Sequence, residues 1–177
     1  MLRDPTHVGA VAPSGRALAH SMCQGLGPKT GQVIEIGAGT GAITKEILKT
    51  ISPDKLSLLE MNSAFCDGLR LAFPGVRVEN LKAQEMKQLS LDNVGAVLSG
   101  LPLLNMPQNV QFDIVSSVFN TLRPGGVFVQ FTYGPRPPIV EPVRRALGLT
   151  WIKGKKIWPN LPPARVYVFS QGKCAVR

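Results

Sequence analysis

The feature that most constrains the fold is a run of three glycines between an apolar segment and a helical one. Gly37, Gly39 and Gly41 follow residues 32–36, a predicted buried strand, and lead into residues 41–50, a predicted helix. Glycines at such a turn allow a tight bend and a close approach of N–H groups to a ligand, and the N-terminus of the helix favours a negative group. The run therefore predicts an α/β fold with a nucleotide-like ligand at the end of the first strand.

Strand-like and helical segments alternate along the rest of the chain, which is typical of a mostly parallel sheet. Further strands are predicted at 55–61, 76–78, 94–99 and 127–133, and helices at 14–26, 62–73, 142–147 and on the apolar face Phe112, Val115, Phe119 and Leu122, before Arg123-Pro124-Gly125-Gly126. Residues 149–158 and 165–170 are expected to pair antiparallel. We therefore expect a doubly wound, mostly parallel, seven-stranded Rossmann-like sheet with an antiparallel C-terminal edge hairpin. One domain should span 1–177, with 1–26 as a lead-in and a helix that cover the site.

Length and composition set the class of protein. The chain has 177 residues, 44% of them hydrophobic, and shows neither a membrane-length apolar run nor a secretory signal, so we expect a cytoplasmic protein. Cys23, Cys66 and Cys174 lack the spacing of metal ligands, which predicts reduced thiols and no metal. Twenty Lys and Arg against eleven Asp and Glu give a net charge of +9. That charge can keep the protein soluble, bind nucleic acid or bind an anionic membrane surface, and composition alone does not distinguish these three functions.

Two acids sharpen the prediction of the ligand. Glu60 lies nineteen residues after Gly41, at the end of the second predicted strand, where its carboxylate can accept both hydroxyls of a ribose. Gly37-x-Gly39-x-x-Ala42 also satisfies a dinucleotide fingerprint. However, Glu35 would repel a pyrophosphate and could instead bind the cationic amino group of a methionine tail. The acids therefore favour S-adenosylmethionine (SAM) over NAD.

The segment Glu35-Ile36-Gly37-Ala38-Gly39-Thr40-Gly41 resembles the first motif of class I SAM-dependent methyltransferases, E/D-x-G-x-G-x-G. The resemblance implies SAM as cofactor, with S-adenosylhomocysteine as product. Glu35 would then reach the methionine end, the loop from Gly37 to Gly41, with Ala38 and Thr40, would contact the cofactor backbone, and Glu60 with Met61 would hold the ribose. Lys82 stands where many relatives carry an Asp that binds adenine, so backbone N–H groups near Ala83 and Gln84 are expected to take that role. Ser99 is the last of the residues expected to bind the cofactor.

The segment after the fourth predicted strand bears on the substrate. Ser99-Gly100-Leu101-Pro102-Leu103 occupies the position of the Asn-x-Pro-Tyr motif of adenine N6-methylating enzymes, and the chain resembles rRNA adenine dimethylases in overall layout. Gly100 replaces the Asn and Leu103 replaces the aromatic residue. A flat base would lose a stacking contact worth ~1–3 kcal/mol, whereas a lipid would lose nothing. Gly100, Leu101, Pro102 and Leu103 are therefore predicted to bind a lipid-like acceptor.

A second resemblance covers nearly the whole chain. Its motifs are Val8 to Ser14, the loop after Ser99, Arg123 to Gly126, Gln130 to Pro135 and Trp158 to Val166. Together they resemble the bacterial phospholipid N-methyltransferases that convert phosphatidylethanolamine to phosphatidylcholine. The resemblance implies a peripheral enzyme on the inner leaflet of the cell membrane, with anionic lipid and phospholipid substrate as partners in preference to nucleic acid. The basic segment between Trp151 and Trp158 suits a membrane interface, although a solvated hairpin with buried Trp residues would also explain it.

The catalytic candidates follow from the acceptor's chemistry. An alkylammonium with a pKa of ~10 must lose a proton before methylation, at a cost of roughly 4 kcal/mol at neutral pH. His7 and Tyr133 are predicted proton acceptors, and the Ser99 and Gly100 carbonyls can orient the amine. Arg136 and Arg16 are predicted to meet a lipid phosphate. An RNA adenine N6-methyltransferase and a non-catalytic SAM-binding module remain the alternatives.

Overall fold

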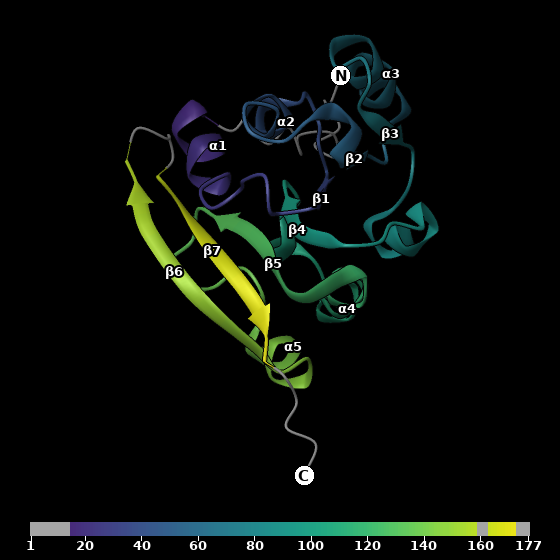
Figure 1. Cartoon of the computed structure of the whole chain (residues 1–177). Helices are drawn as coiled ribbons and strands as arrows, with labels where there is room; N and C mark the ends of the chain where they lie inside the picture. Colours follow the sequence, from purple (N-terminus) through teal and green to yellow (C-terminus); the bar gives the residue numbers. More distant parts are fainter. Residues whose placement is uncertain (1–14, 159–162, 173–177) are drawn as a thin grey trace, which may run out of the picture.

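The computed structural model describes residues 15–158 and 163–172, and its seven strands form one sheet (Figure 1). The strand order is β3-β2-β1-β4-β5-β7-β6. Among the described strands β7 alone runs opposite to the rest, because it pairs antiparallel with both β5 and β6, whereas the other pairs are parallel. This arrangement confirms the predicted fold class. The strands are β1 (Gln32–Ile36), β2 (Leu56–Leu59), β3 (Arg77–Glu79), β4 (Val94–Ser99), β5 (Leu122–Thr132), β6 (Leu149–Ile157) and β7 (Ala164–Gln171).

Helices cover both faces of this sheet because its central strands are apolar on both sides. One buried cluster joins Val33 of β1 to Leu18 of α1 and Ile43 of α2, and the other joins Ile34 of β1 to Ile114 of α4. The α-helices are α1 (Arg16–Met22), α2 (Ala42–Ile47), α3 (Ser63–Ala72), α4 (Gln108–Thr121) and α5 (Glu141–Ala146); η2 (Pro53–Lys55), η3 (Ala83–Leu89) and η4 (Leu103–Asn105) are 3-10 helices. None of the helices in the described residues has the length and apolar character needed to cross a membrane.

The ends of several elements differ from the prediction. The first helix begins at Arg16 with Gly15 as its N-cap, whereas the predicted cap, Ser14, lies outside the described residues. The helix predicted to include Leu122 ends at Thr121, and Leu122 begins β5. Residues 123–126, before which that helix was expected to stop, form a bulge inside β5, because Val94 pairs with Leu122 and Ala96 pairs with Val127. Gly125 permits this bulge with a positive φ of 78°. The described part of the lead-in, α1, packs against α2, β5 and β7.

The parallel pairing brings four chain segments to one edge of the sheet. Ile36 at the end of β1 pairs with Leu59 of β2 and with Ser99 of β4, and Ser99 pairs in turn with Gln130 of β5. The segments that leave these strands are therefore neighbours, as expected for a ligand site in an open α/β sheet.

Candidate functional site

The glycine loop has the backbone conformation that its sequence requires. Gly37, Gly39 and Gly41 have φ values of 69°, 55° and 81°, which L side chains rarely adopt. A Cβ on Gly37 would lie 2.6 Å from Leu101 Cδ2, and one on Gly41 would collide with the Phe73 ring. A Cβ on Gly39 would meet nothing within 4 Å. The loop is thus packed closely on its inner side and open at Gly39.

The Glu60 carboxylate binds this loop directly. Its Oε2 accepts a hydrogen bond from Gly39 N (2.9 Å), and its Oε1 accepts one from Asn62 N (2.9 Å). Its main chain is also fixed, because Glu60 N donates to Glu79 O (3.1 Å) and Asn80 Nδ2 donates to Glu60 O (2.8 Å). Glu60 lies just past β2 and not within it, yet the acid stands beside the loop as predicted.

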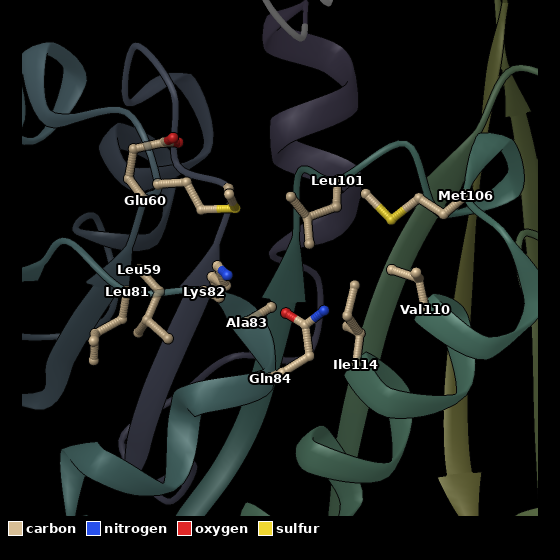
Figure 2. Close-up of a pocket in the computed structure, with 12 residues that line it drawn as sticks. Leu59, Glu60, Leu81, Lys82, Ala83, Gln84, Leu101, Met106, Val110 and Ile114 are labelled. Carbon is tan, nitrogen blue, oxygen red and sulfur yellow. The ribbon is translucent and has the colours of Figure 1, made fainter.

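Glu60 and the glycine loop border a cavity of about 350 Å³. Figure 2 shows Glu60 on one side of it, with Leu101, Met106 and Ile114 on the opposite side. The predicted residues Met61, Ala83 and Gln84 also line the cavity, together with Gly37, Leu59, Leu81, Lys82 and Val110. The N–H groups of Ala83 and Gln84 precede the first hydrogen bond of η3, from Glu85 N to Lys82 O (2.9 Å), so the helix itself does not use them.

Glu35 lies fully buried beneath the glycine loop. The Thr44 hydroxyl donates to Glu35 Oε2 (2.6 Å), while Oε1 has no hydrogen-bond partner among the described residues. Burial raises the pKa of Glu35 to about 8, and the charge of Glu60 adds to this rise, although the bond from Thr44 favours the ionised form. A buried carboxyl with one free oxygen suits a cationic group that would restore its charge.

A second cavity of about 230 Å³ lies on the other side of Leu101. Gly100, Leu101, Pro102 and Leu103, the predicted substrate residues, all line it, and so does Tyr133. The Tyr133 ring is exposed and meets Phe131 edge to face at 5.4 Å between centroids. The remaining lining residues are Leu104, Asn105, Phe131, Thr132 and Gly134. Leu101 therefore separates two adjacent cavities.

Polar side chains hold the loop that contains Leu101. Leu101 N donates to Ser99 Oγ (3.2 Å), and Gln130 Nε2 donates to Leu101 O (2.9 Å). Farther along the loop, Gln111 Nε2 donates to Met106 O (3.1 Å). Ser99 is fully buried, so its hydroxyl supports the loop, and its role in catalysis stays a prediction.

Three comparisons place this geometry among known proteins. The family model described as ribosomal RNA adenine dimethylase matches residues 15–125, well over half of the chain. The chain belongs to this family. It is a class I SAM-dependent methyltransferase, and SAM is its cofactor.

The methyltransferase also has a relative with a lipid substrate in its name. It is 31% identical over 140 residues, 73% of this chain and 72% of the relative, to an ornithine lipid N-methyltransferase of Singulisphaera acidiphila. That relative differs from the phosphatidylethanolamine enzymes of the sequence resemblance in the lipid that its name gives.

Solved structures of low identity share the fold of this methyltransferase. The glycopeptide N-methyltransferase MtfA, complexed with SAM, is 15% identical with a TM-score of 0.69, covering 97% of this chain and 100% of that one. TrmN from Thermus thermophilus is 18% identical with a TM-score of 0.67 over 89% of this chain. This chain spans about half of that protein, 49% of its length.

The described residues fit SAM. The unpartnered oxygen of Glu35 is suited to the cofactor's ammonium group, the open side of Gly39 to its close approach, and Glu60 to its ribose hydroxyls. Gly41 and the buried Ala38 shape the turn, and Thr40 is exposed on it. These individual roles remain predictions for each residue.

Not every predicted site residue lines one of the two cavities. In the described chain the lining residues do not include Glu35, Ala38, Gly39, Thr40, Gly41 or Ser99, which lie in the glycine loop and in the adjoining strands β1 and β4. His7 lies outside the described residues. Arg16 is exposed at the start of α1, and Arg136 is exposed between β5 and α5; within the described chain, neither is among the residues that line the two cavities. The proposed contact of the two arginines with a phosphate stays a prediction.

The sequence analysis missed two kinds of site residue. Thr44 and Gln130 were given no role, because a hydrogen bond to Glu35 or to Leu101 O depends on tertiary packing. The apolar residues Met106, Val110 and Ile114 were also missed. Val110 and Ile114 lie four residues apart on one face of α4, and Met106 lies just before the helix, so this four-residue spacing is a signal that could have identified them.

Replacing Glu35 by glutamine tests the buried acid through stability. The pKa of Glu35 is about 8 in the folded protein and ~4.3 for an exposed glutamate, so the wild type has its full stability below the lower value and loses stability as the pH rises toward 8. Glutamine can still accept the bond from Thr44 but does not titrate. Glu35→Gln should therefore melt above the wild type at pH 8, by several degrees at ~2–4 °C per kcal/mol, and the difference should shrink toward pH 5. A difference in melting temperature between variant and wild type that is the same at pH 5 and pH 8 would contradict a raised pKa of Glu35.

Removing the Glu60 carboxylate should weaken SAM binding at least tenfold. A charge-assisted acceptor for ribose hydroxyls contributes ~1.5–3 kcal/mol. Calorimetric titration of Glu60→Ala with SAM measures the loss, with Asp67→Ala, an exposed acid on α3, as the control of equal charge change. Wild-type affinity in a Glu60→Ala variant whose circular dichroism is unchanged would refute the assignment.

Proposed function

We propose that this methyltransferase transfers methyl groups from SAM to the amine of a lipid head group, as in phosphatidylethanolamine or ornithine lipid. The observation that carries the proposal is the second cavity, which is lined mainly by apolar side chains and adjoins the cofactor cavity across Leu101. The ornithine lipid N-methyltransferase from Singulisphaera acidiphila supports a lipid amine as acceptor. The inner leaflet of the cell membrane is the place of action that goes with this proposal.

The loop after β4 argues against a nucleobase acceptor. Gly100 cannot be replaced by an Asn without rearrangement, because even a Cβ at this position would collide with the Gly37 carbonyl oxygen. Leu103, at the aromatic position of the adenine motif, is 1% exposed and packs in the core. The site therefore lacks both the side-chain amide and the stacking residue that the motif would supply at these two positions.

The second cavity has what an N-methylation needs from the protein. Bound SAM supplies a methyl group on a positively charged sulfur, which a neutral amine attacks as the carbon–sulfur bond breaks and the carbon–nitrogen bond forms. Tyr133 lines the cavity, and its hydroxyl can accept a hydrogen bond from the neutral amine and so orient the nitrogen for attack. Apolar walls at Leu104 and Phe131 exclude water and align the acceptor.

The acceptor can be identified by supplying three of them to the purified protein with isotopically labelled SAM. Phosphatidylethanolamine vesicles, ornithine lipid vesicles and unmodified rRNA are incubated in parallel, and labelled methyl is measured in each. We expect label in at least one lipid amine. Transfer to RNA with none to either lipid would overturn the proposal in favour of an RNA adenine N6-methyltransferase.

A narrower second cavity should lower lipid methylation without changing SAM affinity. Leu104 is 39% exposed, lines this cavity and is absent from the lining of the cofactor cavity in the described chain. Leu104→Phe should reduce kcat/KM for the lipid roughly tenfold or more, because a misplacement of ~1 Å can cost ~100-fold in rate. Leu71→Phe, on the exposed face of α3, is the matched control. Unchanged transfer by Leu104→Phe would place the acceptor elsewhere.

A further inference from the structure

The net positive charge of the chain lies in its C-terminal third. Residues 114–177 contain ten of the twenty Lys and Arg but only one of the eleven acids, Glu141, so they carry the whole net charge of +9. Residues 1–113 contain ten bases and ten acids. Glu141 is itself bound by Arg145 (2.6 Å). A local excess of this size points to a polyanionic partner for this part of the molecule.

Much of this charge lies on β6, the edge strand of the sheet. In the described chain β6 pairs only with β7, and Figure 1 shows it along the outer side of that strand. Trp151 pairs with Phe169, Lys153 with Tyr167 and Lys156 with Arg165. Paired residues share a face of the sheet, so these β6 side chains form one stripe. An irregularity between Lys153 and Lys156 keeps both lysines on that face.

Large apolar side chains are exposed among these lysines. Trp151 is 42% exposed on this face, and Trp158, just past the end of β6, is 69% exposed. Ile152, which is 74% exposed, pairs with Val168 and therefore lies on the opposite face of the strand. Lysines on an edge strand commonly prevent pairing with another chain, but exposed Trp and Ile side chains have the opposite effect. The Arg144 guanidinium lies 4.1 Å from the Trp151 ring centroid, and Lys156 Nζ lies 4.0 Å from that of Trp158. Cations beside Trp rings suit the head-group region of an anionic bilayer, where Trp is enriched and cations are attracted.

One end of the stripe reaches the active edge of the sheet. Ile157 at the end of β6 pairs with Ala164 of β7, and the next residue of β7, Arg165, pairs with Thr132 of β5. Thr132 lines the second cavity. A bilayer against Trp158 would therefore lie at the sheet edge where a lipid acceptor has to enter.

We propose that β6, from Trp151 to Trp158, with Arg144 beside it, is the surface by which this protein docks on an anionic lipid bilayer. This inference rests on the proposed function in that docking there delivers the lipid amine to the second cavity. Binding to the bilayer itself requires neither SAM nor methyl transfer, so it can be tested separately.

The test compares two triple variants that lose the same charge. Lys153, Lys155 and Lys156 are replaced by Gln in one, and the exposed Lys45, Lys55 and Lys87 of the neutral region in the other. Flotation with vesicles of phosphatidylcholine, with and without phosphatidylglycerol, measures binding, and methyl transfer to substrate lipid in uncharged detergent micelles measures the active site. We expect the β6 variant to bind anionic vesicles on the order of a hundredfold more weakly, while the control binds as the wild type does and both methylate micellar lipid.

A second pair of variants tests the apolar part of the surface. Trp158→Ser should weaken vesicle binding, whereas Leu71→Ser, which removes an exposed apolar side chain from α3, should not. The inference would be overturned if the β6 triple variant bound anionic vesicles as well as the wild type does. It would also be overturned if the wild type did not bind vesicles and the β6 triple variant instead lost binding to rRNA. If vesicle binding depends on β6 but the wild type methylates no lipid, the docking surface would be upheld and the proposed function would be rejected.

Discussion

The contact between the glycine loop and the segment after β4 determines the geometry of the whole site. Gly100 lies so close to the Gly37 carbonyl oxygen that no side chain fits between them, and Gly100 N donates to Ile36 O (2.9 Å). On the other side of the same contact, Gly37 leaves room for the Leu101 side chain. Two glycines, one just past each of the adjacent parallel strands β1 and β4, thus allow the segments after these strands to touch, and Leu101 lines both cavities.

Buried polar groups keep this contact in place. Gln130 on β5 and Ser99 on β4 both bind the main chain of Leu101: Gln130 donates to its carbonyl oxygen, and Ser99 accepts from its N–H. Each bond lies in a low-dielectric interior, where an unmade bond would cost ~1–3 kcal/mol. Glu60 does the same for the other side of the cofactor cavity through Gly39. In the proposed function, the methyl donor and the acceptor would meet beside this loop, whose fixed position would define their line of approach.

The cofactor half of the site could be predicted from the sequence because its signals are local. Three glycines with positive φ follow a buried strand, and an acid follows the next strand, so spacing alone placed Glu60 beside Gly39. The parallel direction of the first five strands was predicted from the alternation of elements, whereas their order in the sheet was not predicted. The antiparallel edge pair was also predictable, since its two strand-like segments are neighbours along the chain.

The acceptor half could not be predicted to the same depth because its geometry depends on a single 3-10 turn. Leu103 and Leu104 both line the second cavity, but in the η4 turn Leu103 is buried in the core and Leu104 is partly exposed, although the two residues are adjacent and identical. The carboxyl of Glu35 was predicted, but its partner Thr44 comes from the facing helix. The sequence left open whether Trp151 and Trp158 are exposed or buried, because their exposure depends on the bulge in β6 and on the pairing of this edge strand.

Residue-resolved amide shifts in the NMR spectrum test most directly whether donor and acceptor occupy two cavities that share one wall. The isotope-labelled protein is titrated with S-adenosylhomocysteine and, separately, with a micelle-dispersed lipid amine. The account predicts that the first ligand shifts the amides of residues 37–41, 60–61 and 81–84, that the second shifts those of residues 100–105 and 131–134, and that Leu101 responds to both. The account would be contradicted if the lipid amine shifted no amides of the second cavity, or if it displaced S-adenosylhomocysteine from the first cavity.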